Sequence, residues 1–380
     1  MATIALLGNG MRGHFGPLTG LARVLAGHGH RLVGWVPREL MPELEGVVEA
    51  CRPHEPVRLA SLEVAGFGVA LAEATPDAVE LLVEELDVEA VELIVHDVHV
   101  PWARVAADFL GLPRIVSTPV FPGPLSVNAG HPRLPREGFG SARSGQIARV
   151  DTVAAVVSRR WGIELGDINR VIWNAGEMTV SYSTARITGL PERFPRWTFV
   201  GPLLDPPPER AREGELPLVY VSLGTVEHVE TMALRVVLRA LRDEPVEVLV
   251  STGGADRSSA ELGPVPDNAV VRRFVATQEV LARASVFVTH GGANSVHESL
   301  SAGVPMVCQP QGADQYEWSR RVVELGAGEW VPADPDAIRD AVRALLSDPR
   351  ATLRARELGA ELHRYDGEGR VDRLVAVALA

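Results

Sequence analysis

Short apolar runs alternate with amphipathic stretches along the first half of the chain. The apolar runs have the length of buried strands, and the stretches between them repeat their hydrophobic positions with the period of a helix. The expected strands are Thr3–Leu7, Arg31–Val36, Val91–Val95 and Arg114–Ser117, and the expected helices are Pro17–Gly27 and Trp102–Leu110. Strands that alternate with helices usually form a parallel sheet with right-handed crossovers. The pattern therefore predicts an α/β fold.

The same alternation restarts in the second half. Its expected strands are Leu218–Ser222, Val246–Ser251 and Ser285–Thr289, with a helix at Val229–Leu241. Residues 204–217, between the halves, are rich in proline and charged residues, which is typical of a linker. We therefore expect two βαβ domains, at residues 1–203 and 218–366, and a helix at 367–380.

The length and hydropathy of the chain are those of a two-domain globular protein. It has 380 residues, and 46% of them are hydrophobic, which is enough for two cores. No apolar run reaches the ~20 residues of a membrane-spanning helix. Residues 1–7 begin with a strand rather than with a charged and apolar leader. We therefore expect a cytoplasmic protein without an integral membrane segment, either a monomer or a homodimer.

The charged residues and cysteines argue against several classes of function. A net charge of −12, without a basic patch, argues against a nucleic-acid partner. All 37 basic residues are arginine, so no lysine is present to form a Schiff base or to bind phosphate in a P-loop. Cys51 and Cys308 stand alone, which favours neither a disulfide framework nor a zinc site.

A glycine-rich turn in the second half has the features of an anion site. Its sequence, His290-Gly291-Gly292, follows the apolar run Ser285–Thr289 and precedes a helix that begins near Ala293. The N–H groups of a helix start lack partners within the helix and bind anions. We therefore expect phosphate at this turn.

Polar side chains along the same helix indicate a nucleotide ligand. At about 100° per residue, His290, Asn294 and Glu298 fall within ~80° of one helix face. Asn294 and Ser295 can donate to phosphate oxygens, whereas the Glu298 carboxylate only accepts, and ribose offers it two hydroxyl donors. The spacing predicts a nucleotide-sugar site, although an ordinary turn with satisfied side chains gives the same pattern.

The pattern HxGxNSxxE, followed by GVP and DQ, resembles the donor-binding signature of the family 1 glycosyltransferases. The resemblance covers both halves and is sharpest over residues 274–315. It implies the GT-B fold, in which two Rossmann-like domains face each other across a cleft and a C-terminal helix crosses back to the first domain. It also implies that the first domain binds the acceptor and the second binds the nucleotide-sugar donor.

The resemblance assigns donor-binding roles by position. It implies that the diphosphate is bound by His290, Asn294 and Ser295. It also implies that Glu298 binds the ribose hydroxyls and that Asp314 and Gln315 bind the sugar hydroxyls. Further donor-binding candidates in the glycine-rich turns are Gly13, Gly224, Thr225, Gly292 and Ala293.

The base-binding positions depart from the family pattern. Phe274 stands where the family has a tryptophan that stacks on the base, and Val275 offers backbone groups to the base edge. The proline and glutamine of the family are replaced by Ala276 and Thr277. Phenylalanine still stacks, but the choice between uracil and thymine stays open.

His14 and Asp97 form the expected catalytic pair. His14 follows the first strand, and Asp97 stands at the carboxyl end of another, where ligand crevices form in α/β folds. Histidine can take the proton of an acceptor hydroxyl near neutral pH, and a carboxylate stabilises the resulting imidazolium. The resemblance places the same two residue types at these positions. The alternatives are a turn histidine that caps its own helix and a loop carboxylate bound to backbone.

A second glycine pattern supports a different function. Gly8, Gly10 and Gly13 form the spacing GxGxxG after the first strand, as in dinucleotide-binding folds. The acidic residue expected after the second strand is absent, but Arg38 could bind the phosphate of NADP. An NADP-linked oxidoreductase is therefore the main alternative, and a non-catalytic nucleotide-sugar-binding protein is another.

Two short strings resemble metal sites. In the DxD string that begins at Asp334, the aspartate suits a helix N-cap and Pro335 suits the first helical position. His96, Asp97 and His99 also resemble a metal site. Strand alternation, however, places His96 and Asp97 on opposite faces of the sheet, and no second cluster of residues with the spacing of metal ligands is present. We therefore expect no metal and no cofactor.

Together these patterns predict an inverting, metal-independent hexosyltransferase. It would move a sugar from a UDP- or dTDP-linked donor to a hydroxyl of a small hydrophobic natural product, as macrolide glycosyltransferases do. Residues 121–176 are less regular, with a helix near 147–172, and correspond to the acceptor-binding insertions of the family. The aromatic residues that would line an acceptor pocket, or belong to the core instead, are Phe67, Trp102, Phe121 and Phe139.

Overall fold

The chain divides into two compact units. The computed structural model describes residues 1–55, 57, 64–122, 144–174, 176, 178–205, 208, 216–224, 230–253, 262–312 and 314–380. Unit 1 comprises Met1–Arg186, Leu190–Leu203 and Asp366–Ala380, and unit 2 comprises Ile187–Gly189 and Leu204–Tyr365. Phe139, Thr225 and most of the expected linker lie outside the described residues.

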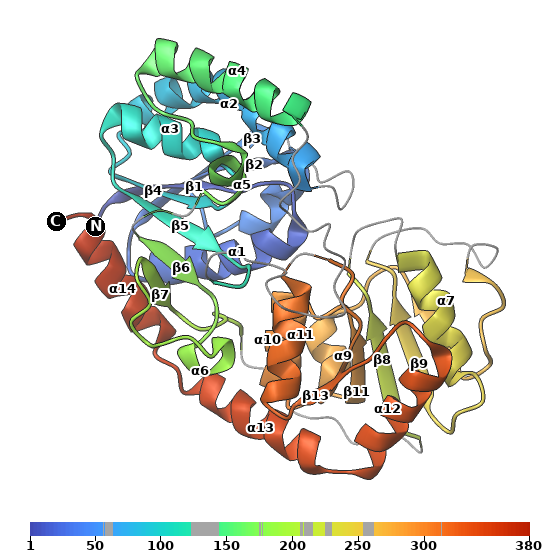
Figure 1. The fold of residues 1–380 in the computed structure, drawn as a ribbon. Coiled ribbons are helices and arrows are strands. Elements are labelled where there is room, and N and C mark those ends of the chain that lie inside the picture. The colour runs from blue at the N-terminus through green and yellow to red at the C-terminus, as the bar shows by residue number, and fades with distance from the viewer. Residues whose placement is uncertain are drawn as a thin grey trace. The chain divides into compact units, whose positions relative to one another are not determined.

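A seven-stranded parallel sheet with the order β3-β2-β1-β4-β5-β6-β7 forms the centre of unit 1 (Figure 1). Its strands are β1 (Thr3–Leu7), β2 (Arg31–Pro37), β3 (Ala50–His54), β4 (Leu93–Asp97), β5 (Arg114–Thr118), β6 (Thr179–Ser181) and β7 (Trp197–Phe199). Because β1 and β4 are parallel neighbours, their carboxyl ends lie side by side at one edge of the sheet.

Helices cover both faces of this sheet because the strand residues alternate between two cores. In β1, Ile4 and Leu6 join one core, and Ala5 and Leu7 join the other. The helices of the first core are α1 (Arg12–Gly27) and α14 (Gly367–Ala378), and those of the second are α2 (Val64–Val88), α3 (Pro101–Leu110), α4 (Ser144–Trp161) and α5 (Ile168–Ile172). Figure 1 shows α2, α3 and α4 on the side of the sheet opposite α1. Two shorter elements are η1 (Arg38–Leu44) and α6 (Ala185–Thr188).

Unit 2 contains a six-stranded parallel sheet with the order β10-β9-β8-β11-β12-β13. Its strands are β8 (Leu218–Ser222), β9 (Glu247–Ser251), β10 (Ala269–Arg272), β11 (Ala284–Thr289), β12 (Met306–Cys308) and β13 (Gly328–Trp330). β8 and β11 are neighbours, so the turns that follow these two strands lie side by side.

The helices of unit 2 also pack on both faces of its sheet (Figure 1). Val219 and Val221 of β8 pack with α7 (Glu230–Leu241) and α12 (Pro335–Ser347). On the opposite face, Tyr220 and Phe287 stack with their ring centroids 4.7 Å apart. The remaining helices are α9 (Thr277–Leu281), α10 (Ala293–Ser301), α11 (Gln315–Glu324) and α13 (Arg350–His363), the last of which packs against α10.

Helix α1 begins earlier than the sequence pattern predicts. Its first residue is Arg12 rather than Pro17, so His14 lies in its first turn. Proline usually marks a helix start, but Pro17 lies within α1.

Two other elements also have different bounds from those expected. The strand expected at Val91–Val95 is β4, Leu93–Asp97, which makes Asp97 its last residue. The helix expected near 147–172 is divided into α4 and α5, because Gly162 and Gly166 adopt φ values of 71° and 88°, which end a helix.

The sequence pattern did not predict β3 or α2. Pro53 lacks an N–H group and interrupts a strand pattern, but β3 tolerates it because this strand lies at the edge of the sheet. Helix α2 contains Gly68 and Pro76, both weak helix formers. A Cβ on Gly68 would lie 2.7 Å from Cδ1 of Ile172 in α5, so the glycine permits close packing of the two helices. Tertiary packing thus stabilises α2.

The predicted N-cap at Asp334 is confirmed. Its Oδ1 accepts hydrogen bonds from N of Asp336 at 3.1 Å and from N of Ala337 at 3.0 Å, and Pro335 is the first residue of α12. These bonds satisfy two N–H groups at the helix start. The DxD string is therefore a helix cap in this fold.

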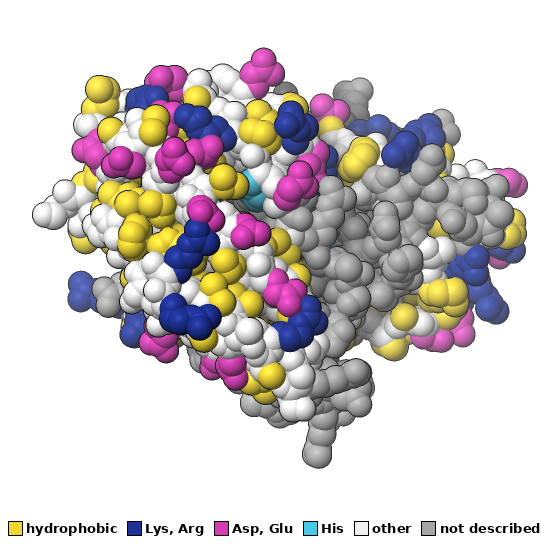
Figure 2. Space-filling model, turned by 90° about the horizontal axis from the view of Figure 1, so that it is seen from above, with side chains coloured by type: hydrophobic (Ala, Val, Ile, Leu, Met, Phe, Trp, Pro, Cys, Tyr) yellow, Lys and Arg dark blue, Asp and Glu magenta, His cyan; other side chains and the backbone are white. Residues whose placement is uncertain are grey.

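Polar side chains are well mixed on the visible surface. Figure 2 shows acidic and arginine side chains interspersed with hydrophobic ones on the face that it displays. Within the described residues, every helix is either too short or too polar to cross a membrane.

Candidate functional site

His14 and Asp97 are in contact within unit 1. His14 belongs to the first turn of α1, and Asp97 ends β4. Nδ1 of His14 lies 2.7 Å from Oδ2 of Asp97. The Asp97 side chain is 1% exposed and the His14 side chain 13% exposed. The pair therefore combines a buried carboxylate with a histidine that reaches the surface.

A second hydrogen bond fixes the orientation of Asp97. Its Oδ1 accepts from N of His99 at 2.8 Å. Burial alone raises the pKa of Asp97, but the charge and hydrogen bond of His14, together with His99, outweigh burial and hold this pKa below its usual value. Asp97 is thus an anion near neutral pH.

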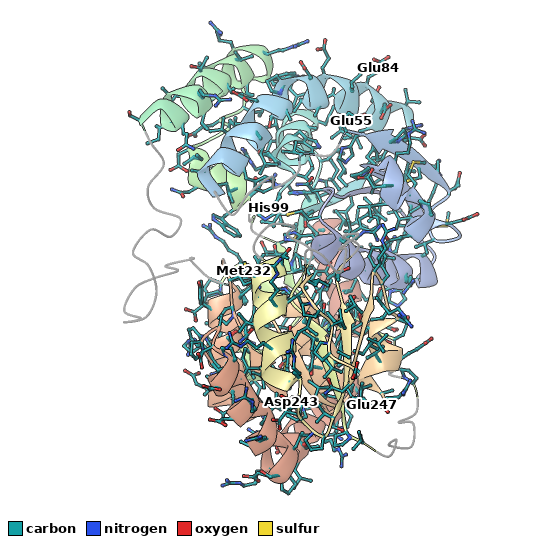
Figure 3. The ribbon with its side chains drawn as sticks, turned by 90° about the vertical axis from the view of Figure 1, so that its right-hand side faces the viewer. Glu55, Glu84, His99, Met232, Asp243 and Glu247 are labelled. Carbon is teal, nitrogen blue, oxygen red and sulfur yellow. The ribbon has the colours of Figure 1, made fainter. Side chains whose placement is uncertain are left out.

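His99, labelled in Figure 3, adds an uncharged ring beside this pair. Its ring centroid lies 4.8 Å from that of His14 and 5.4 Å from that of Trp173. Nδ1 of His99 is 2.7 Å from the carbonyl oxygen of Ile172. Burial lowers the pKa of His99 to about 4, so this ring is neutral near pH 7 and does not repel a proton on His14.

Two of the aromatic acceptor candidates belong to the core of unit 1. Phe67 is 6% exposed and meets the ring of His99 edge-on, with 5.3 Å between centroids. Trp102 is 4% exposed and meets His54 edge-on at 5.9 Å. Phe121 is partly buried. The structure thus places Phe67 and Trp102 among the core residues, and an acceptor contact for Phe121 stays a prediction.

His96 precedes Asp97 on β4. It is fully buried, and burial lowers its pKa to about 4. Its Nδ1 is 2.9 Å from the carbonyl oxygen of Asp97. Across the described part of the chain, no three side chains of His, Cys, Asp or Glu gather as metal ligands do.

Two glycines of unit 2 lie beside the ring of His290. A Cβ on Gly292 would overlap Nε2 of this ring, and a Cβ on Gly224 would lie 3.4 Å from the same atom. Gly291 has a φ of 75°, in the left-handed region that favours glycine. A larger residue at position 292 would displace the ring, so Gly292 is needed for the position of His290.

The His290 ring is buried, neutral and incompletely hydrogen-bonded. Burial lowers its pKa to about 4. Its Nδ1 has no hydrogen-bond partner among the described residues. Such buried polar atoms are uncommon in folded proteins. The atom marks a place where a ligand can supply the missing partner.

Helix α10 begins directly after this turn. Gly292 is its N-cap residue and contributes no side-chain cap. Asn294 and Ser295 belong to the first turn, and both are partly buried. Because the N-cap residue makes no side-chain cap bond, the N–H groups of this turn are suited to an anion, and phosphate binding here stays a prediction.

Glu298 lies one helical turn after Asn294 on α10. Burial raises the pKa of its carboxyl group to about 7. Hydrogen-bond donors favour the ionised form of a carboxyl group. A ligand with hydroxyl groups would supply such donors to Glu298.

Asp314 and Gln315 are held by hydrogen bonds at the start of α11. Oδ2 of Asp314 accepts from Nε1 of Trp318 at 2.9 Å. Oε1 of Gln315 accepts from N of Gln311 at 2.8 Å and from N of Gly312 at 3.2 Å. Both polar side chains therefore have defined orientations.

The other donor candidates occupy different environments. Phe274 is 58% exposed, so its ring is accessible to a base. Val275 and Ala293 are partly buried. A Cβ on Gly13, in unit 1, would meet no atom within 4 Å, which leaves open space beside the first turn of α1.

The sequence analysis missed the roles of His99, Trp173 and Trp318 in these contacts. Trp318 follows Asp314 by four residues on a helix, a spacing that brings two side chains together and was readable from the sequence. His99 was considered only as a metal ligand. Trp173 has no local signal, because its contact with His99 joins distant segments.

One family model matches the chain over residues 235–365. It describes the C-terminal domain of proteins similar to the erythromycin biosynthesis protein CIII. The matched range belongs to unit 2 and includes His290, Glu298 and Asp314.

Curated relatives match the whole chain or its parts. The uncharacterized UDP-glucosyltransferase YojK of Bacillus subtilis (strain 168) is 24% identical over 395 residues, which cover 97% of this chain and 95% of YojK. Demethyllactenocin mycarosyltransferase of Streptomyces fradiae is 33% identical over 162 residues, which cover 42% of this chain and 35% of that enzyme.

The fold also matches solved glycosyltransferases. The glycotransferase of kitacinnamycin superimposes with a TM-score of 0.81 at 24% identity, with 100% of this chain and 99% of that chain covered. At this identity the likeness shows the fold, which is GT-B, as the resemblance implied. This chain therefore has the GT-B fold, and the matching family model and the full-length relative are those of glycosyltransferases.

Proposed function

We propose that this protein is an inverting, metal-independent hexosyltransferase. It moves a hexose from a UDP- or dTDP-linked donor to a hydroxyl of a small hydrophobic natural product. His14 is the general base, and Asp97 is its partner. The observation that carries the proposal is the 2.7 Å hydrogen bond between Nδ1 of His14 and the buried carboxylate of Asp97.

The hydrogen bond determines which nitrogen of His14 does the chemistry. Since Nδ1–H donates to Asp97, the lone pair lies on Nε2, which accepts the proton of the acceptor hydroxyl. The acceptor oxygen then bonds to the anomeric carbon as the bond to the diphosphate breaks on the opposite side. The proton remains on His14, where Asp97 stabilises the imidazolium until solvent takes the proton.

The leaving diphosphate is stabilised by the residues around the start of α10. Asn294 and Ser295 donate to its oxygens, the N–H groups of the first turn face its charge, and the His290 ring supplies a further polar contact. Fixed donors of this kind stabilise charge as it develops. In this proposal they take the place of a metal ion, and Thr225, which lies outside the described residues, is a further donor.

The rest of the donor is held by side chains of unit 2. The ribose hydroxyls donate to Glu298, the sugar hydroxyls contact Asp314 and Gln315, and the base stacks on the exposed ring of Phe274. Val275 offers backbone groups to the base edge. Transfer requires this sugar to meet the acceptor oxygen beside His14.

The acceptor class rests on the relatives. One relative is named as a mycarosyltransferase of demethyllactenocin, and one solved structure is a glycotransferase of kitacinnamycin. These names support a hydrophobic natural product as acceptor here. The open space beside Gly13 and the partly buried Phe121 would then lie near the bound acceptor.

A donor and acceptor panel tests this proposal. Purified protein is incubated with UDP- and dTDP-hexoses and with macrolide and aromatic aglycones, and products are identified by mass spectrometry. We expect a mass gain of one hexosyl residue (a hexose less one water), an anomeric coupling in NMR that shows a β-glycoside from an α-linked donor, and the same rate in EDTA. An α-glycoside, or loss of activity in EDTA, would contradict it. Binding of nucleotide diphosphate without any transfer would identify a non-catalytic binding protein instead.

A further inference from the structure

Trp318 is a buried residue whose indole N–H bonds to Asp314, which is proposed above to contact the sugar. Trp318 is 1% exposed, and its Nε1 donates to Oδ2 of Asp314 at 2.9 Å. The two residues are also joined by the backbone bond from N of Trp318 to O of Asp314, at 3.1 Å. The indole N–H therefore orients a carboxylate that stands at the start of α11.

The start of α11 packs against the glycine-rich turn of His290. A Cβ on Gly291 would overlap Oγ of Ser319 and would lie 3.4 Å from the carbonyl oxygen of Gln315. Because only glycine allows this approach, the first turns of α11 lie directly beside the turn that precedes α10. A hexose linked to a diphosphate at the start of α10 would thus be close to Asp314.

Trp318 also contacts α10 through His297. The two rings meet edge-on, with 5.1 Å between centroids. Nδ1 of His297 lies 2.7 Å from the carbonyl oxygen of Ala293, the first residue of α10. Burial lowers the pKa of His297 to about 4, so its ring is neutral. Trp318 thus connects the phosphate end of the expected donor site to the carboxylate at its sugar end.

We propose that Trp318 is a positioning residue for sugar recognition. Its N–H fixes the plane of the Asp314 carboxylate, so that the carboxylate accepts from two vicinal hydroxyls of the donor hexose. A deoxy-hexose that lacks one of these hydroxyls forms fewer hydrogen bonds with the oriented carboxylate, so its transfer depends less on Trp318. The inference rests on the role of Asp314 in the proposed function, and it adds the residue that gives Asp314 its geometry.

The test compares Trp318→Phe with the wild type. Phenylalanine keeps an aromatic ring against His297 but removes the N–H donor. We expect kcat/KM for the hexose donor to fall about tenfold, while the affinity for free UDP or dTDP, measured by calorimetry, changes less than about twofold. The preference for the full hexose over its deoxy analogue should also shrink. Unchanged kcat/KM and preference would overturn the proposal, and so would an equal loss of nucleotide affinity, which would indicate a purely structural role.

A double-variant cycle tests whether Trp318 acts through Asp314. If it does, Asp314→Ala combined with Trp318→Phe should be no worse than Asp314→Ala alone. Fully additive losses would contradict this. Trp330→Phe, a tryptophan of β13 that packs on Tyr316 at 5.9 Å, is the matched control and should leave kcat/KM and sugar preference unchanged.

If Trp318→Phe does not fold, position 318 can carry 3-benzothienylalanine, which keeps the bicyclic shape of tryptophan and lacks its N–H. The same loss of kcat/KM is expected, and wild-type kinetics in this protein would overturn the proposal. Failure of the proposed function is distinguishable from these outcomes. In that case the wild type itself would transfer no sugar from any donor of the panel.

Discussion

Nδ1 of His14 and Oδ2 of Asp97 lie 2.7 Å apart, although 83 positions separate the two residues in the chain. The parallel pairing of β1 with β4 brings them together, because α1 starts just after β1 and Asp97 ends β4. A buried carboxylate paired with a partly exposed histidine is suited to general-base catalysis. The following predictions test this and the other assignments.

Removing the imidazole should abolish most transfer to alcohols. We expect His14→Ala to lower kcat/KM about 10²–10⁴-fold, and Asp97→Asn to lower it somewhat less because Asp97 acts through the histidine. The double variant should be no worse than His14→Ala. Initial rates with an aliphatic alcohol and with an acidic phenol provide the measurement, since a pre-ionised phenol should recover part of the rate. Full activity of His14→Ala towards the alcohol would rule out this mechanism.

Nucleotide diphosphates should stabilise the protein against heat, whereas NADPH should not. The proposed phosphate site surrounds His290, and the GxGxxG pattern that starts at Gly8 is not followed by the acidic residue that a dinucleotide fold has after its second strand. UDP or dTDP at about 100 times its dissociation constant should add ~2.7 kcal/mol to the free energy of unfolding. Differential scanning fluorimetry measures the shift in Tm. A shift with NADPH alone would favour the oxidoreductase alternative.

Glu298 and Asp314 should affect different steps. Because the ribose hydroxyls donate to a charged group, Glu298→Ala should weaken UDP binding by about 1–3 kcal/mol. Asp314→Ala should reduce sugar transfer and leave the affinity for free UDP nearly intact. Calorimetry with UDP and initial rates with the sugar donor separate the two effects. Equal losses of UDP affinity in both variants would refute the assignment of one residue to ribose and the other to the sugar.

Glu298 should make the stability of the protein depend on pH. Burial raises its pKa to about 7 in the folded protein, whereas an exposed glutamate has a pKa of about 4.3. The folded state therefore retains a proton that the unfolded state releases. The resulting stabilisation is present below about pH 4 and is lost as the pH rises to about 7. We expect Glu298→Gln to show a weaker pH dependence over this range in urea unfolding. An identical dependence in both proteins would contradict the shifted pKa.

Asp334 should matter for stability and not for catalysis. Its carboxylate caps α12, so Asp334→Ala should lower the free energy of unfolding by about 1 kcal/mol. Asp334→Ser, which can still cap, is the matched control and should retain most of the stability. Urea unfolding and transfer rates with and without added Mg²⁺ provide the measurements. A loss of activity in Asp334→Ala that Mg²⁺ restores would reveal a metal role for the DxD string.

Local features of the chain were predictable from its sequence. The apolar runs that became β1 and β8, the turn at His290 and the cap at Asp334 each depend on residues within a few positions of one another. Strand length, helix period, glycine turns and capping are short-range effects, and they act before distant parts of the chain meet. The HxGxNSxxE part of the donor signature was readable for the same reason, since residues 290–298 span one turn and one helix.

The distant contacts were decided only by the tertiary structure. Two contacts, His14 with Asp97 and His99 with the carbonyl oxygen of Ile172, join segments that are far apart in the chain. Whether these segments meet in space depends on the strand order and on where each helix starts. β3 and α2 exist because neighbouring elements stabilise them against their own proline and glycine residues. The pKa of Glu298 likewise follows from burial by surrounding residues. Burial and long-range hydrogen bonds are properties of the packed fold, and no short window of the sequence contains them.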